Sequence, residues 1–135
     1  MERSALIPSI CPYCGVGCGL YLEVADETVV GLEYMRDHPT NEGALCPKGN
    51  ASLGFVYHRD RLHYPMVKVK GEFERTSWSE ALFFIANNLK RIRTQRGPDA
   101  LGFLASAKCT NEENYLLQKL ARVLGTNNID HCARL

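Results

Sequence analysis

The sequence predicts a mixed fold, α/β in its second part and α+β overall: a small β-rich domain over residues 1–62, then the beginning of a parallel α/β domain over residues 63–135. Two observations predict this division. Glycines, prolines and short strand-like runs fill the first part, whereas the second alternates strand-like runs with two long amphipathic segments. With 45% hydrophobic and 23% charged residues, the 135-residue chain has the composition of a globular protein.

The first part predicts one hairpin and one long loop. Leu20–Val24 and Val29–Tyr34 are strand-like and flank a turn over residues 25–28. Residues 38–50 contain two prolines and two glycines, which predicts a loop without a helix. A hairpin this small buries little apolar surface, so we expect a bound group to contribute to its stability.

The second part opens with a strand and a helix. Met66–Lys70 alternates like a strand and Gly71 predicts a turn. Ser77 and Glu80 have the spacing of a capping box, in which each side chain accepts a hydrogen bond from the other residue's backbone N–H, and Gly97-Pro98 ends the helix. The helix carries one predicted apolar stripe, made of Leu82, Ile85, Leu89 and Ile92.

A second strand–helix–strand set follows. Residues 100–105 predict a buried strand, Thr110 and Glu113 form a second capping box, and residues 128–130 begin another strand. The order of these elements predicts a parallel sheet. The helix between the strands ends at Gly125, and we expect its apolar side chains to face inward: Leu116, Leu117, Leu120, Val123 and Leu124.

Four of the six cysteines form the array Cys-x2-Cys-x3-Cys-x27-Cys, namely Cys11, Cys14, Cys18 and Cys46. Three closely spaced thiolates completed by a distant Cys-Pro are typical of a 4Fe–4S cluster, and the intervening glycines let backbone amides approach its sulfurs. A zinc site usually takes two short Cys pairs. A glutaredoxin-like dithiol needs a helix, which these glycines disfavour, and a disulfide framework needs a secreted context. The array therefore favours the cluster over these three alternatives.

Charge and hydropathy give no basis for two classes of partner. A net charge of +1 provides no broad basic surface for nucleic acid or an anionic membrane. No apolar run approaches the ~18–20 residues that span a bilayer. Ten residues precede the first cysteine, which is too few for a signal peptide or a twin-arginine leader. We therefore expect a cytoplasmic, reducing location.

Several motifs together resemble a known enzyme family. The run CPYCGVGCG from Cys11 and the run LCPKG from Leu45 resemble the cluster domain of the molybdenum or tungsten bis-pterin oxidoreductases. The segment TNEENYLLQKLAR from Thr110 and the segment GTNNIDHCARL from Gly125 are similar to catalytic α subunits of cytoplasmic formate dehydrogenases. The resemblance covers essentially the whole chain, which would be the N-terminal portion of such a subunit.

The resemblance implies a set of roles. It makes Cys11, Cys14, Cys18 and Cys46 the cluster ligands and places Lys48 between the cluster and the nearer pterin, where a cation stabilises the reduced cluster. It implies a Mo or W bis-molybdopterin guanine dinucleotide in the full-length protein and reversible oxidation of formate to CO2. The implied partners are an electron-accepting β subunit or a larger redox complex with flavin or iron–sulfur subunits.

The resemblance also places the Cys or selenocysteine that binds Mo or W immediately after Leu135. Because UGA encodes selenocysteine and is normally a stop codon, we expect selenocysteine there; the chain itself then holds no catalytic residue and is inactive alone. Relatives often carry Arg at the position of Lys108, and Cys109 and Cys132 lie outside the array, so the roles of these three stay open. The alternatives are another bis-pterin oxidoreductase such as assimilatory nitrate reductase, a non-enzymatic iron–sulfur electron carrier, and a zinc-binding interaction module.

Overall fold

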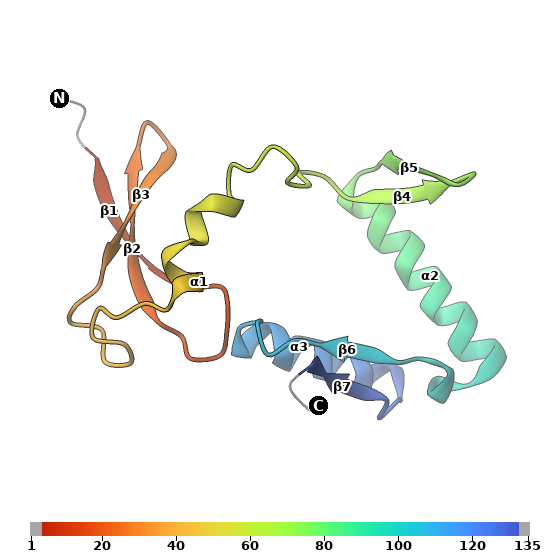
Figure 1. Cartoon of the computed structure of the whole chain (residues 1–135). Helices are drawn as coiled ribbons and strands as arrows, with labels where there is room; N and C mark the ends of the chain where they lie inside the picture. Colours follow the sequence, from red (N-terminus) through yellow and green to blue (C-terminus); the bar gives the residue numbers. More distant parts are fainter. Residues whose placement is uncertain (1–3, 133–135) are drawn as a thin grey trace. The chain divides into compact units, whose positions relative to one another are not determined.

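The computed structural model describes residues 4–132. The chain divides into two compact units, and each is described by itself. The first contains the residues up to Arg59 together with Ser106–Tyr115, and the second contains Asp60–Ala105 and the residues from Leu116 onward. The mixed α/β fold expected from the sequence is confirmed (Figure 1).

The first unit contains a three-stranded antiparallel sheet (Figure 1). Its strands are β1 (Ala5–Ile10), β2 (Gly19–Ala25) and β3 (Thr28–Tyr34), in that spatial order. The predicted hairpin is confirmed as β2–β3, and its tight turn places Asp26 and Glu27 at φ angles of 46° and 59°. Both angles lie in the left-handed region, as a two-residue type I′ hairpin turn requires.

Strand β1 was not predicted because Pro8 interrupts its apolar pattern. Proline cannot donate a hydrogen bond within a sheet, and it is tolerated here because β1 is an edge strand. The predicted loop over residues 38–50 also differs in part. It ends in the one-turn helix α1 (Pro47–Asn50), after which comes the 3-10 turn η1 (Ser52–Phe55). A helix of four residues is too short to show a hydrophobic period in the sequence.

The second unit begins with a hairpin and a long helix (Figure 1). Strand β4 (Met66–Val69) pairs antiparallel with β5 (Glu72–Arg75) across a turn at Lys70 and Gly71, whose φ angles are 50° and 100°. The partner strand β5 was not predicted. Helix α2 (Trp78–Arg96) begins with both reciprocal bonds of the predicted capping box and ends at Gly97, with φ 82°.

A short parallel pair completes the described chain. Turn η2 (Pro98–Ala100) leads to β6 (Phe103–Ala105), and helix α3 (Asn111–Leu124) connects β6 to β7 (Ile129–His131). Strands β6 and β7 are parallel, as the strand–helix–strand order predicts. The first strand of the expected set does not join them, because β4 pairs with β5 instead.

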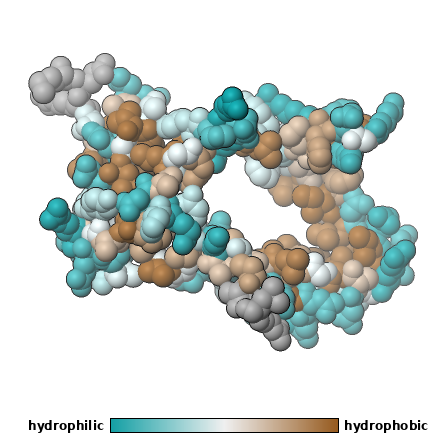
Figure 2. All heavy atoms as spheres, viewed as in Figure 1, coloured by the Kyte–Doolittle hydropathy of each residue, from teal (hydrophilic) through white to brown (hydrophobic). Residues whose placement is uncertain are grey.

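The hydrophobic period predicts the helices correctly but not which of their residues are buried. Ala81 of α2 and Ala121 of α3 are buried, whereas Leu82 is 58% exposed and Val123 is 68% exposed. The strand expected over residues 100–105 is present as β6, Phe103–Ala105, but its expected burial is wrong, because Leu104 is 85% exposed. Figure 2 shows hydrophobic residues, in brown, at the surface of the molecule. Within residues 4–132, no helix combines the length and apolar character needed to cross a membrane.

Candidate metal centre

The connection between β1 and β2 carries three of the four array cysteines. Cys11 follows β1 directly and Cys18 precedes β2. The backbone N–H of Cys11 donates to the carbonyl of Cys18 at 2.8 Å, which extends the strand pairing by one step beyond Ile10 and Gly19. The register of the β1–β2 pair therefore fixes the two ends of a tight loop, and Cys14 lies within that loop.

The fourth cysteine returns to this loop at the start of α1. Cys46 is the N-cap residue of that helix, and Pro47 occupies its first turn. Gly49, one turn on, is buried against the loop: a Cβ built at this position would lie 3.7 Å from Cys11 Sγ. The turn that carries Cys46 thus packs directly on Cys11, although 34 residues separate the two cysteines (46 − 11 − 1).

Two side chains from the loop after β3 hold it to Gly19, the residue after Cys18. Asn41 forms a pair of bonds with the Gly19 backbone: Oδ1 accepts from the N–H at 2.8 Å and Nδ2 donates to the carbonyl at 3.1 Å. The Nδ1 atom of His38 also accepts from the Gly19 N–H, at 3.3 Å. Gly19 is buried, and a Cβ there would collide with the His38 ring. Only glycine allows this close approach.

A second asparagine fixes the turn around Cys46. The Nδ2 atom of Asn50 donates to the carbonyls of Leu45 at 3.0 Å and of Cys46 at 3.3 Å. Its Oδ1 atom accepts from the Tyr34 hydroxyl of β3 at 2.7 Å. The turn is therefore anchored to the sheet, and Asn41 and Asn50 together connect the two cysteine segments through amide groups.

The electrostatics show that the four thiols lie near one another. Burial raises the pKa of the Cys18 thiol, and the charges of Cys11, Cys14 and Cys46 raise it further. The pKa of the Cys46 thiol is lowered, first by the amide N–H of Gly49, then by the amide N–H and the ammonium of Lys48. These two amides face the Cys46 sulfur, but the Cys46 side chain does not make a capping hydrogen bond to the helix. Mutual repulsion of this kind arises only when negative charges gather at one place.

The donor set fits a cluster. A 4Fe–4S cubane binds each thiolate through a different iron, so its four sulfurs stand further apart than the ligands of one ion. In the part of the chain that the structure describes, no three His, Cys, Asp or Glu side chains are close enough to share a single metal ion. Three thiols whose charges all act on the Cys18 thiol, together with backbone amides directed at the Cys46 sulfur, suit an anionic cluster better than a zinc ion.

The remaining residues singled out from the sequence are not all at this site. Lys48 is exposed on α1, two positions after Cys46. Lys108 is exposed and Cys109 half-buried in the segment before α3, while Cys132 is exposed after β7. The expected Mo or W ligand after Leu135 lies outside the described residues. Asn128 has a structural role, because its Nδ2 donates to the carbonyl of Asp99 at 2.9 Å.

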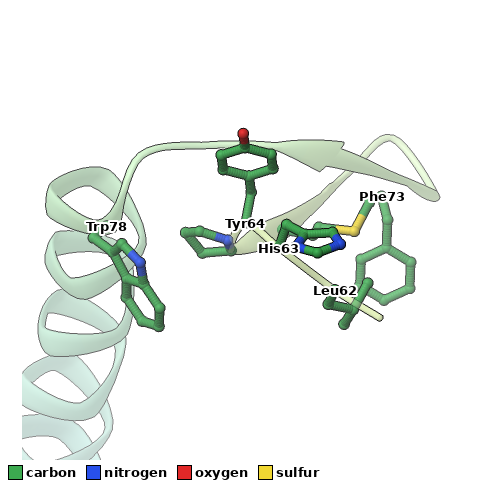
Figure 3. A pocket seen from close by; sticks show the side chains of 7 residues that line it. Leu62, His63, Tyr64, Phe73 and Trp78 are labelled. Carbon is green, nitrogen blue, oxygen red and sulfur yellow. The ribbon is translucent and has the colours of Figure 1, made fainter. Parts of the chain in front are cut away.

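A separate hollow lies in the second unit, where the chain enters β4 (Figure 3). It encloses about 510 Å³ and is lined by apolar and aromatic side chains, with Tyr64, Phe73 and Trp78 among those in view. The Arg75 guanidinium stacks on the Tyr64 ring at 3.1 Å from its centroid. No array cysteine contributes to this hollow.

Comparison with protein families divides the chain close to residue 60. Residues 5–58 match the molybdopterin oxidoreductase Fe4S4 domain. Residues 61–135 match the molybdopterin oxidoreductase family itself.

Individual relatives agree with these matches. The α subunit of an F420-dependent formate dehydrogenase from Methanocaldococcus jannaschii is 53% identical over 131 residues, covering 96% of this chain and 19% of the relative. The α subunit of F420-dependent formate dehydrogenase 2 from Methanococcus maripaludis is 49% identical, covering 100% of this chain and 20% of the relative. The chain thus spans about a fifth of the length of these relatives. Among solved structures, acetylene hydratase from Pelobacter acetylenicus matches with a TM-score of 0.72 and 27% identity, over 92% of this chain and 18% of that one.

Proposed function

The chain belongs to the molybdopterin oxidoreductases, and we propose that it forms the N-terminal part of a formate dehydrogenase catalytic subunit. The proposed reaction is the reversible oxidation of formate to CO2, which releases one proton and two electrons. One observation carries this choice: nearly the whole chain is about half identical to α subunits that are named formate dehydrogenases. Acetylene hydratase has a similar fold at 27% identity, so the fold alone does not select the substrate.

In this proposal Cys11, Cys14, Cys18 and Cys46 hold the 4Fe–4S cluster. Two observations support the assignment. The charges of the other three cysteines act on the Cys18 thiol, and Asn41 accepts a hydrogen bond from the backbone N–H of Gly19, next to Cys18. The cluster, when bound, supplies one-electron transfer, by which electrons leave the site of formate oxidation. Lys48 already acts on the Cys46 thiolate, and its cation would stabilise added negative charge. The proposed boundary between the cluster domain and the pterin domain lies between residues 62 and 63.

The finer cofactor assignments rest on the family resemblance. We propose a bis-molybdopterin guanine dinucleotide carrying Mo or W, with Cys or selenocysteine as its protein ligand beyond Leu135, in a cytoplasmic enzyme. Elemental analysis of the purified full-length protein distinguishes Mo from W, and mass spectrometry of the peptide that follows Leu135 distinguishes sulfur from selenium.

We propose the deazaflavin F420 as the electron acceptor, and we propose that the electrons reach it through a partner subunit. The names of two relatives from different methanogens support this choice. Formate-dependent reduction of F420, of NAD(P) and of ferredoxin by the full complex separates the three acceptors. Reduction of NAD(P) or ferredoxin alone would overturn the F420 assignment and leave formate oxidation intact.

The central test uses the full-length protein purified without oxygen. We expect about four iron and four acid-labile sulfide per chain, and reduction of a dye when formate is added. Cys46→Ser is the matched variant, and we expect it to lose cluster iron. Zinc in place of iron would favour a zinc module, nitrate reduction without formate oxidation would favour a nitrate reductase, and a cluster without either activity would favour an electron carrier. The 135-residue chain alone should not reduce the dye with formate.

A further inference from the structure

Helix α3 touches the cysteine loop through its first residue. The Nδ2 atom of Asn111 donates a hydrogen bond of 2.9 Å to the carbonyl of Gly15, which lies between Cys14 and Cys18. The two residues are 96 positions apart in the sequence. In sequence, Asn111 belongs to the segment that matches the molybdopterin oxidoreductase family, but in space Ser106–Tyr115 belongs to the unit that holds the cysteines.

The backbone at Gly15 is shaped for this contact. A Cβ built on Gly15 would collide with Asn111 Oδ1 and lie 3.2 Å from its Cγ. The loop carbonyl and the amide therefore meet only because residue 15 has no side chain. The hydrogen bond and the missing Cβ describe one close contact, in which the Asn111 amide lies directly against the backbone of Gly15.

Asn111 is itself held firmly. Thr110 and Glu113 form the second capping box: the Thr110 N–H donates to the Glu113 carboxylate at 2.7 Å, and the Glu113 N–H donates to Thr110 Oγ1 at 3.3 Å. The side chain of Asn114 also donates to the carbonyl of Ser106, upstream of the helix, at 3.2 Å. The start of the helix is thus ordered by its own hydrogen bonds. Little additional conformational entropy of the backbone is therefore lost when the Asn111 amide donates to Gly15.

We propose that Asn111 is a positioning residue for the cluster ligands: it fixes the Cys14–Cys18 segment and thereby ties cluster binding to the start of α3. The inference rests on the proposed cluster site. Asn111 acts through Gly15 and touches no cysteine in this role. A hydrogen bond of this kind contributes about 0.5–1.5 kcal/mol. Its loss should therefore increase the rate at which the site loses iron by about two- to tenfold.

The test measures how fast the full-length protein loses iron to a chelator, followed by its visible charge-transfer absorption, and the electron paramagnetic resonance spectrum of the reduced cluster. Asn111→Ala removes the donor. Asn111→Asp keeps the shape and favours the helix N-terminus, but it places a carboxylate against a carbonyl. Gly15→Ala separates the partners from the other side. We expect all three to lose iron about two- to tenfold faster and to show altered spectra.

Two matched controls should behave as wild type. Glu112→Ala changes the exposed neighbour in the same helical turn, and Gly54→Ala adds a Cβ where no atom lies within 4 Å. Faster iron loss in Asn111→Asp with an unchanged or higher helix content separates positioning from folding. Wild-type rates and spectra in all three test variants overturn the inference alone. A wild-type protein that binds no iron and sulfide overturns the proposed cluster site as well.

Discussion

Replacing Asn41 by alanine should loosen the backbone beside Cys18. The wild-type side chain makes three hydrogen bonds, two with the Gly19 backbone and one from Nδ2 to the carbonyl of Ala44 at 3.0 Å. At about 1 kcal/mol each, the three contribute about 3 kcal/mol at most. The remaining His38 contact to the Gly19 N–H offsets part of the loss, so we expect about 2–3 kcal/mol of local destabilisation.

Amide hydrogen exchange at Gly19 is the direct assay, because this N–H is the group that Asn41 accepts from. A loss of 2–3 kcal/mol corresponds to about 30- to 160-fold faster exchange. Asn41→Asp keeps the acceptor and loses both donated bonds, so its exchange should fall between wild type and alanine. Asn88→Ala is the control, since Asn88 bonds within α2 in the other unit. Unchanged Gly19 exchange in Asn41→Ala would refute the reasoning.

Three further outcomes follow from other parts of the chain. With the cluster removed, Cys46 should be alkylated several-fold faster than Cys18 near neutral pH, because amide groups lower the pKa of the first thiol while burial raises that of the second; equal rates, measured by peptide mass spectrometry, would contradict this. Hydrogen bonds from Ser77 lower the pKa of Glu80 to about 2, so its stabilising effect is full above its unfolded pKa of about 4.3 and is lost as pH falls through about 2. The difference in unfolding midpoint between wild type and Glu80→Gln should therefore shrink over that window, and a constant difference counts against the capping box. Finally, Glu27→Gly should stabilise the β2–β3 hairpin by about 1 kcal/mol, because glycine adopts a φ of 59° without strain; thermal unfolding of the two proteins measures this, and destabilisation by glycine would show that the strain argument is wrong.

The sequence predicts well where a rule acts over short distances. Both capping boxes and the end of α2 at Gly97 follow from local hydrogen bonding and from glycine at positive φ, and the structure has all of them. Strands β1 and β5 escaped prediction, since Pro8 interrupts one pattern and three of the four residues of β5 are charged. Pairing partners, which lie elsewhere in the chain, decide such strands.

Burial was the least predictable property. Leu82 and Ile85 have helical spacing, yet they are 58% and 52% exposed. Periodicity identifies the face of a helix that can be buried, while the surface that covers it lies elsewhere in the fold. The sequence therefore gives the helix and its apolar face without giving the partner of that face.

At the candidate site, spacing predicts the four cysteines as ligands, but it does not point to the residues that bond to their loops. Asn41, Asn50 and Asn111 lie in or beside turn-like segments, where asparagine is common for its own local bonding. Asn41 and Asn111 bond to backbone groups 22 and 96 positions away, and Asn50 accepts from the Tyr34 hydroxyl 16 positions away. No local pattern indicates such a contact, because the bond depends on how the segments meet in three dimensions.

The chemical nature of these three asparagines has a consequence for tuning. Amide side chains carry no net charge near neutral pH, so they fix the loops without adding a charged group beside the cysteines. The shape of the site and its charge are therefore set by different residues. A change at Lys48 can alter the electrostatic potential at Cys46 while the amide contacts of Asn41, Asn50 and Asn111 stay in place, so the charge of this site can be changed without rebuilding the loops that form it.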